Sequence, residues 1–353
     1  MSVDTSAPAI AAAAVEFPAN YHSQHEVIDA LVSAAGPEFM RFAEAAGVQS
    51  RHLALPLHRY AELSGFTEAN SAFLDVAMDL GERALRSAIE SAGLQPSDVD
   101  VVFSTTVTGA VVPTLEARLA ARVGLRPDVK RVPLFGLGCV AGAAGVARMN
   151  DYLRAYPDQV AVLLAVELCS LTIQRDDVSV ANLVASSLFG DGAAAVVAVG
   201  AQRADATDRR MPRVRASRSR LYPDSSEVMG WQIGSGGFKI VLSPDVPNIT
   251  EKYLGEDVRL FLSDHGLQTT DIATWICHPG GPKVIESVEC VLDLPGGSLD
   301  RTRKSLSDNG NLSSVSVLDV LRANLAEPAP AGANGVMIAM GPGFCSELVL
   351  LGW

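Results

Sequence analysis

The stretch VPLFGLGCVAGAAGVARMNDYL, residues 132–153, decides the fold. A strand-like run ends at Phe135, and the glycines at 136 and 138 permit a sharp turn before Cys139. Small residues follow the cysteine, so a helix that begins there can pack closely against its neighbours. The positive end of a helix dipole favours the thiolate form of a cysteine. The stretch therefore predicts a nucleophile at Cys139; a small buried cysteine that only fills the turn is the alternative.

Short β-branched runs alternate with helical patterns along the rest of the chain. Strands that alternate with helices indicate an α/β architecture with buried sheets. Apolar residues at helical intervals would line one face of the longest expected helix. The expected strands cover residues 99–107, 160–166, 193–199, 273–277 and 335–340, and that helix covers residues 73–92.

A weak internal repeat divides the chain. Cys139 opens one small-residue helix, Asn311 opens another, and an expected strand follows each helix. A duplicated strand–helix–strand unit would place the two residues at equivalent helix starts that face a shared centre, with chance similarity as the alternative. Gly, Asp, Arg and Pro interrupt the apolar pattern near residues 200–213. We therefore expect an N-terminal half over 1–205 and a C-terminal half over 206–353.

Composition excludes several classes of protein. The net charge of −12 argues against nucleic-acid or membrane-surface binding. No apolar run reaches the ~18 residues of a membrane span, and the first residues lack the basic flank of a secretory signal. The five scattered cysteines form neither a CxxC pair nor a Cys/His cluster. We expect a reduced cytoplasmic protein without disulfides or zinc, in which the basic run 203–220 is a solvated loop that feeds a strand.

Two further residues complete a chemical set with Cys139. His278, in ATWICHPGGPKVI, follows a buried strand, at the edge where α/β folds bind ligands. Asn311, in SDNGNLSSVSVLDVL, opens the second helix. A turn histidine without a role and a simple helix N-cap are the alternatives. Together, a Cys/His pair can give an activated thiolate, and His with Asn can donate two hydrogen bonds to one oxyanion.

The segments GCVAGAAG, HPGGP, GNLSS and MGPGF, in this order, resemble the chalcone and stilbene synthase superfamily. The similarity is greatest to actinobacterial type III polyketide synthases of the alkylpyrone or alkylresorcinol kind. It covers nearly the whole chain and is weakest before Arg41. The resemblance implies an α/β thiolase fold with two duplicated halves in αβαβα layers, a homodimer, and a catalytic triad of Cys139, His278 and Asn311.

The resemblance also implies a pair of phenylalanines between the CoA tunnel and the cavity. One carries over to Phe189. Aligned on the DVP motif, the second position falls on Ile240, with Phe238 two residues earlier as the alternative. An aliphatic residue there would relax the gate. The glycines of MGPGF, Gly341 and Gly343, are expected at the substrate site.

Four more substrate-binding positions follow from the resemblance alone. Cys169 stands at a position that lines the pocket, and Val112 near the position that reaches across the dimer. Arg41 and, more loosely, Arg51 stand where the family has basic residues near the CoA phosphates.

The implied mechanism is a decarboxylative condensation. Cys139, held as a thiolate by an ion pair with His278, would take a starter acyl group from acyl-CoA. Malonyl-CoA would lose CO₂ against His278 and Asn311 to give an enolate, which attacks the Cys139 thioester. The scheme uses CoA thioesters as substrates and needs no metal or cofactor. We expect a medium- to long-chain aliphatic starter and alkylpyrone or alkylresorcinol products, with methylmalonyl-CoA left open as the extender.

Three other functions stay open at this point. The first is tetrahydroxynaphthalene or another phenol made from malonyl-CoA. The second is a single condensation of the ketoacyl synthase III kind. The third is a non-catalytic thiolase-fold scaffold, against which the intact set of Cys139, His278 and Asn311 argues.

Overall fold

Nine strands form one hydrogen-bonded sheet, and their order repeats the same pattern twice. The structure is a computed structural model that describes residues 6–35, 38–207 and 209–353. In spatial order the strands are β11 (Ile272–Cys277), β12 (Asn334–Gly341), β13 (Cys345–Gly352), β8 (Arg213–Leu221), β1 (Ala9–Glu16), β7 (Asp191–Val199), β6 (Val160–Leu168), β4 (Val101–Thr105) and β5 (Lys130–Leu134).

The repeat is visible in the strand directions. In the first half β4 is parallel to β6, and β7 and β1 follow antiparallel. In the second half β11 is parallel to β12, and β13 and β8 follow antiparallel. The halves join where β1 meets β8, with Ala9 paired to Arg213. This is the duplication that the sequence predicted; the boundary between residues 205 and 206 stays a prediction.

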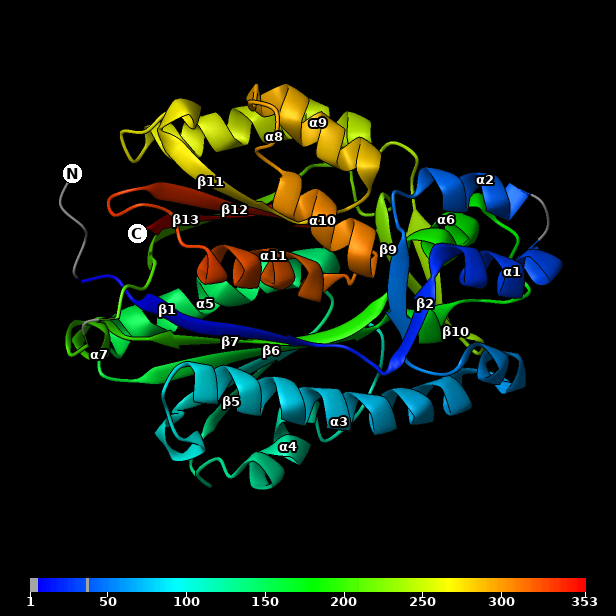
Figure 1. Ribbon diagram of the computed structural model, residues 1–353, viewed down its shortest axis with the longest axis horizontal. Helices are drawn as coiled ribbons and strands as arrows, with labels where there is room; N and C mark the ends of the chain where they lie inside the picture. Colours follow the sequence, from blue (N-terminus) through cyan, green and yellow to red (C-terminus); the bar gives the residue numbers. More distant parts are fainter. Residues whose placement is uncertain (1–5, 36–37, 208) are drawn as a thin grey trace.

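Helices separate and cover the two halves of the sheet, giving five layers (Figure 1). One set of helices lies in the centre, and other helices cover each outer face (Figure 1). The expected αβαβα fold is therefore confirmed. The central helices are α5 (Ala141–Ala155) and α11 (Ser314–Ala326), the helices of one outer face are α3 (Phe66–Ser91) and α4 (Leu115–Val123), and those of the other are α8 (Val246–Ser263) and α9 (Pro282–Leu292).

The smaller elements gather mainly at one end of the layers, near the carboxyl ends of β6 and β12 (Figure 1). These elements are β2 (Asn20–Ser23), α1 (Gln24–Ala35), α2 (Glu38–Ala45), β3 (Ser50–Leu53), α6 (Val180–Leu188), β9 (Met229–Gly234), β10 (Gly237–Leu242) and α10 (Asp300–Asn309), and α7 (Ala201–Asp205) lies at the opposite end. The chain also forms the 3₁₀ turns η1 (Leu57–Glu62), η2 (Pro96–Asp98), η3 (Gly138–Val140), η4 (Cys169–Thr172) and η5 (Thr269–Asp271).

Within the described residues, no helix has the length and apolar character needed to cross a membrane.

The small residues after Cys139 let α5 and α11 touch. A β-carbon at Gly142 would lie 2.4 Å from the carbonyl oxygen of Ser314, and one at Gly145 would lie 2.6 Å from the Leu163 side chain. Side chains at these positions would push α5 away from both neighbours. Every residue of β6 and β7 is buried, because these strands have helices on both faces. The core therefore sits directly behind the nucleophile turn.

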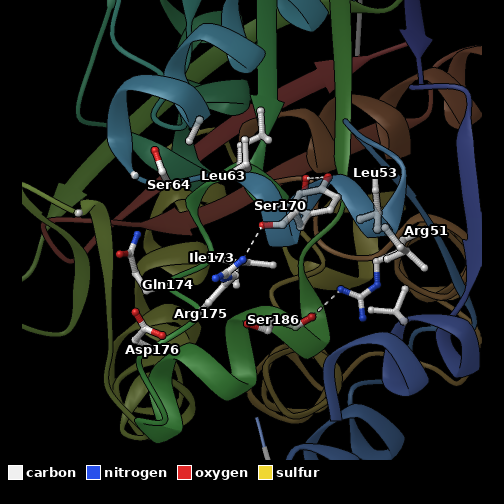
Figure 2. Close-up of a pocket in the computed structure, with 17 residues that line it drawn as sticks. Arg51, Leu53, Leu63, Ser64, Ser170, Ile173, Gln174, Arg175, Asp176 and Ser186 are labelled. Atoms are coloured by element: carbon white, nitrogen blue, oxygen red, sulfur yellow. Dashed lines mark hydrogen bonds between the residues drawn. The ribbon is translucent and has the colours of Figure 1, made fainter. Parts of the chain in front are cut away.

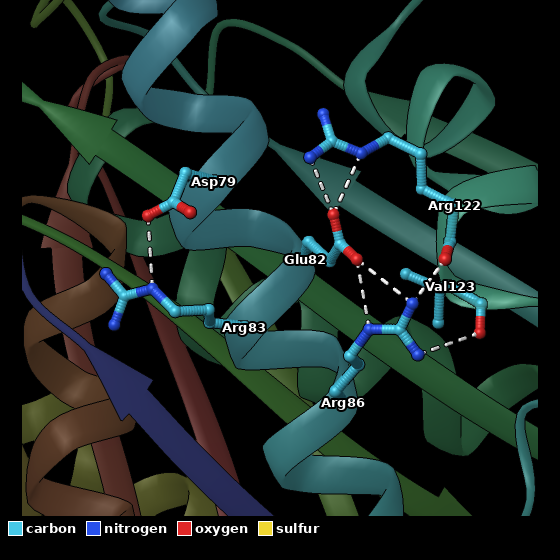
Figure 3. Close-up of polar contacts among 6 residues, drawn as sticks. All are labelled: Asp79, Glu82, Arg83, Arg86, Arg122 and Val123. Atoms are coloured by element: carbon cyan, nitrogen blue, oxygen red, sulfur yellow. Dashed lines mark hydrogen bonds and ion pairs between the residues drawn. The ribbon is translucent and has the colours of Figure 1, made fainter.

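Polar contacts on the surface fasten α4 to α3 (Figure 3). Glu82 of α3 accepts hydrogen bonds from Arg86 Nε at 3.1 Å and from Arg122 Nε of α4 at 2.8 Å. On the same helix Arg83 Nε donates to Asp79 at 3.1 Å. These pairs are exposed, so each contributes at most about 1 kcal/mol, and the apolar face of α3 holds the layer in place.

The basic run 203–220 is only partly the solvated loop that we expected. Residues 209–212 lie outside any helix or strand and lead into β8, which begins at Arg213 and pairs with β13 along its length. Two arginines of this strand meet carboxylates of α8 or of the turn after it: Arg220 Nη1 lies 3.1 Å from Asp257, and Arg218 pairs with Asp264. Part of the positive charge is therefore neutralised within the fold.

Candidate active site

Cys139 lies on the 3₁₀ turn that precedes α5, and its side chain is buried. Gly138 has φ of +55°, and a β-carbon there would lie 2.8 Å from the Pro342 ring. A β-carbon at Gly341 would lie 2.9 Å from the backbone nitrogen of Val140. The MGPGF segment therefore packs against the nucleophile turn, which needs glycine on both sides of the contact.

The surroundings of Cys139 favour the neutral thiol over the thiolate. Its Sγ donates to Ser313 Oγ at 3.8 Å, and no hydrogen bond joins it to His278 in the part of the chain that is described. Burial, together with the nearby Glu167 carboxylate, raises the pKa of the thiol to about 12. The expected ion pair is absent because desolvation outweighs the helix N-terminus when no cation is close.

His278 follows β11, as the sequence predicted, and is buried. Its backbone N–H donates to Ile338 of β12 at 2.8 Å, which fixes the turn. Its Nδ1 is buried without a hydrogen-bond partner among the described residues. Burial lowers the pKa of the ring to about 4, so the imidazole is neutral. A neutral ring carries one N–H and can still donate to an oxyanion.

Asn311 pairs with the segment around Phe189. Its N–H donates to Leu188 at 2.8 Å, and its carbonyl accepts from Gly190 at 3.0 Å. The N-cap alternative is wrong, because α11 begins at Ser314. Instead, Oδ1 of Asn311 accepts a hydrogen bond from the Ser313 backbone at 2.8 Å. This leaves the amide nitrogen of Asn311 as the free donor.

A buried carboxylate, which the sequence analysis missed, stands behind the nucleophile. Glu167 near the end of β6 is fully buried and lies in an otherwise apolar strand. A single acidic residue within the apolar run VAVLLAVEL was the sequence signal that could have indicated this buried carboxylate. It accepts hydrogen bonds from Ser314 Oγ at 2.6 Å, Thr108 Oγ1 at 3.0 Å and the Val107 backbone at 3.1 Å. Burial raises the pKa of Glu167 to about 7.

Arg51 is buried and supports the fold, and its implied role near the CoA phosphates stays a prediction. Its side chain is only 1% exposed, and its guanidinium donates to the backbone carbonyls of Ser186 and Ser187 at 2.8 Å and of Phe189 at 2.7 Å. Burial lowers its pKa to about 10. Its two terminal nitrogens are engaged inside the protein, whereas its Nε has no hydrogen-bond partner among the described residues. Arg41 is exposed, with its guanidinium 5.1 Å from the Phe42 ring centre, and stays a prediction.

Both candidates for the second gate lie on the same face of β10. Phe238 is buried, with its ring centre 5.4 Å from that of Phe66 and 6.1 Å from that of Trp231. Ile240 is half-buried and pairs across the hairpin with Trp231. Phe189, the first gate position, is half-buried at the end of α6. All three remain predicted gate positions.

The remaining predicted positions fall in different surroundings. Cys169 is buried at the start of η4, and burial raises its pKa well above the ordinary value. Val112 is 92% exposed, as a residue that needs a partner molecule would be. Gly343 has φ of +135°, and a β-carbon there would lie 2.9 Å from Leu221, so it shapes the MGPGF turn rather than a pocket.

A cavity of about 280 Å³ opens beside this site (Figure 2). Its wall includes Ser170, the neighbour of Cys169, and Tyr60, whose hydroxyl lies 2.5 Å from Ser170 Oγ. Apolar side chains fill much of the rest, including Leu53 and Leu63. None of the three triad residues lines it. The cavity therefore does not contain the predicted triad residues.

Comparison with known proteins identifies the family. Residues 37–203 match the chalcone and stilbene synthases, N-terminal domain, and residues 213–352 match the chalcone and stilbene synthases, C-terminal domain. The chain belongs to the chalcone and stilbene synthase family. Among curated relatives, 1,3,6,8-tetrahydroxynaphthalene synthase from Streptomyces peucetius subsp. caesius is 54% identical over 315 residues, which are 89% of this chain and 83% of that protein. A putative chalcone synthase from Bacillus subtilis (strain 168) is 35% identical over 370 residues, 100% of this chain and 98% of that protein.

A solved structure agrees. The bacterial type III polyketide synthase 1,3,6,8-tetrahydroxynaphthalene synthase from Streptomyces coelicolor A3(2) matches with a TM-score of 0.91 and 29% identity, over 98% of this chain and 99% of that one. The protein is therefore a type III polyketide synthase with a thiolase fold, and an acyltransferase. The relatives favour the tetrahydroxynaphthalene alternative over the alkylpyrone product that we expected.

Proposed function

We propose that this polyketide synthase builds a phenol of the tetrahydroxynaphthalene type from malonyl-CoA alone. The observation that carries the proposal is the 54% identity to a 1,3,6,8-tetrahydroxynaphthalene synthase. A naphthalene skeleton with oxygen on alternate carbons can be assembled entirely from two-carbon units. Malonyl-CoA can therefore serve as both starter and extender, and no second acyl-CoA is needed.

The proposed chemistry uses the three triad residues in sequence. The Cys139 sulfur attacks the starter thioester, CoA leaves as its thiol, and the thiol proton of Cys139 goes to the departing sulfur. Malonyl-CoA then loses CO₂, and the electron pair of the broken C–C bond becomes an enolate. His278 and the amide nitrogen of Asn311 donate to the enolate oxygen. The enolate carbon attacks the Cys139 thioester, and the cysteine sulfur leaves.

The neutral imidazole of His278 supports this role. A neutral ring donates to the enolate without trapping it as an ion pair, and its buried Nδ1 has no competing partner among the described residues. Asn311 has its Oδ1 engaged by Ser313, which leaves its amide nitrogen for the substrate. Two such donors in a dry site stabilise developing charge far more than in water.

Arg41, exposed on α2, is the proposed contact to CoA phosphate.

We propose that the enzyme acts as a homodimer. Val112 is 92% exposed and Phe135 is 61% exposed. They follow β4 and β5, which run parallel, so both residues leave the sheet at the same end. β5 is the outermost strand of the sheet, with one edge unpaired. A second copy of the chain would cover this edge and both apolar side chains.

One experiment tests the proposed product. The purified enzyme is incubated with isotopically labelled malonyl-CoA alone, and products are identified by mass. An aromatic product with label in every two-carbon unit is expected, and none from Cys139→Ala. A second candidate, an alkyl starter, is favoured by the apolar wall of the cavity around Leu53 and Leu63. Product that forms only when an aliphatic acyl-CoA is added would overturn the malonyl-only proposal in favour of that candidate.

A further inference from the structure

Ser313 adopts a backbone conformation that suits glycine. Its φ is +51° and its ψ is −126°. Asp293, another residue other than glycine with positive φ, has ψ of +50° and so lies in the left-handed helical region that Asp tolerates. Ser313 lies outside that region. The Val315 N–H donates to the Leu312 carbonyl at 3.1 Å, so Ser313 occupies the first corner of a tight turn that leads into α11.

This corner decides which way the amide of Asn311 points. The Ser313 N–H donates to Oδ1 of Asn311 at 2.8 Å. Only the oxygen end of an amide can accept a hydrogen bond from an N–H. The nitrogen end must therefore face the other way, as a donor to an enolate oxygen requires. If the Ser313 peptide turned away, Asn311 would lose the contact that fixes its two ends.

The Ser313 hydroxyl lies between the nucleophile and the buried acid. It is 3.8 Å from the Cys139 sulfur and 3.4 Å from Oε1 of Glu167. The titratable groups that face the thiol are Glu167 from β6 and Cys169 from η4. The contacts of the hydroxyl hold the Ser313 side chain in place, and the hydrogen bond to Asn311 holds its backbone N–H in place.

We propose that Ser313 is a positioning residue, whose strained corner fixes the Asn311 amide and whose hydroxyl fixes the Cys139 thiol. This rests on the roles proposed above for Cys139 and Asn311. Strained backbone persists only where the surroundings enforce it, and it clusters at functional sites. Glycine would take the corner without strain but has no hydroxyl. Serine meets both requirements.

Two variants separate the backbone role from the hydroxyl role. Ser313→Gly loses the hydroxyl but keeps the corner, because glycine adopts it freely. Ser313→Ala loses the hydroxyl and keeps the strain, so the corner relaxes.

Release of CO₂ from malonyl-CoA should stay close to the parent rate in S313G. In S313A it should fall by about tenfold to a hundredfold, somewhat less than complete removal of an oxyanion donor. Alkylation of Cys139 by iodoacetamide at a fixed pH should slow equally in both variants, because the hydroxyl contact favours the thiolate.

Melting temperatures and a matched control show whether the effect is only structural. Asp293→Gly relieves another positive-φ residue, at the end of α9. It should leave decarboxylation and alkylation unchanged. The proposal is overturned if S313A releases CO₂ as fast as S313G. It is also overturned if S313G itself loses decarboxylation, and this second result can be read even when S313A does not fold. If Asn311→Ala decarboxylates normally, the proposed function of the site fails instead, whatever the Ser313 variants do.

Discussion

The guanidinium of Arg51 donates to the carbonyl oxygen of Phe189 at 2.7 Å, across 138 residues of sequence. Further hydrogen bonds reach Ser186, Ser187 and Gln24, so the cation holds the end of α6 against β3. Phe189 also forms a parallel bridge with Asn311. The buried guanidinium of Arg51 therefore supports the segment around Phe189 that pairs with Asn311.

Arg51→Met is expected to destabilise the fold. The change removes the Arg51 donor from the carbonyl groups of Ser186 and Phe189, at a cost of about 1–3 kcal/mol for each unsatisfied group. Thermal or urea unfolding measures the loss. Arg41→Met is the matched control, since that arginine is exposed and should shift the free energy of unfolding by less than about 0.5 kcal/mol. The Arg41 variant should instead raise KM for malonyl-CoA. Equal stability of the two variants would show that the Arg51 bonds contribute little.

Cys139→Ala is expected to abolish the covalent acyl adduct, because no other nucleophile is proposed. Intact-protein mass spectrometry after incubation with malonyl-CoA or an acyl-CoA measures the adduct. Cys169→Ala removes another buried cysteine and should keep the adduct. An adduct of unchanged mass on the Cys139 variant would remove that residue from the mechanism.

Asn311→Ala is expected to slow CO₂ release from malonyl-CoA by about 100- to 1,000-fold, the usual cost of one lost oxyanion donor. Acyl loading of Cys139 should fall much less. The backbone bonds to Leu188 and Gly190 do not need the side chain, so the fold should survive. Asn309→Ala, two residues earlier, is the control and should decarboxylate normally. Loss of loading with decarboxylation intact would reverse the assigned role.

The fold could be predicted from the sequence because it depends on local patterns, whereas the triad stays a prediction that the family resemblance implies. Buried strands read as continuous apolar runs, and Cys139, His278 and Asn311 each stand at a turn that adjacent residues define. The structural contacts of Arg51 were not foreseen because its partners come from the end of α6, far along the chain. The thiolate expectation failed for a similar reason. A helix start is visible in the sequence, whereas complete burial beside Glu167 arises only when β6, α5 and α11 pack together.

Glu167→Gln is expected to change the pH dependence of stability. The pKa of Glu167 is about 7 in the folded protein and ordinarily 4.5, so the native state prefers the protonated form. That preference stabilises the fold fully below pH 4.5 and is lost as the pH rises through 7. Glutamine stays neutral throughout, so the variant should gain melting temperature relative to the parent between about pH 5 and pH 8.

Glu82→Gln supplies a control of opposite sign. Hydrogen bonds from Arg86 lower the pKa of the Glu82 carboxylate, so its charged form stabilises the fold. The Glu82 variant should therefore have a lower melting temperature than the parent at neutral pH, and this difference should disappear in acid. Melting curves of both variants at several pH values make the comparison. A Glu167 variant whose difference from the parent does not change with pH would mean that folding leaves the pKa of this carboxyl unchanged.

The last prediction concerns starter choice and Ile240. This residue and Phe238 point to the same face of β10, and the Phe238 ring already fills the space against Phe66 and Trp231. A second ring at position 240 would narrow any passage along this face. Ile240→Phe should therefore reduce turnover of long aliphatic acyl-CoA steeply with chain length, since each further methylene must pass or pack against the new ring. Use of malonyl-CoA alone should persist. Val241→Phe places the same ring on the opposite face of the strand and should leave the length profile unchanged. If the Ile240 variant keeps the parent profile, Ile240 only packs in the hairpin, and the argument for a relaxed gate at this position is lost.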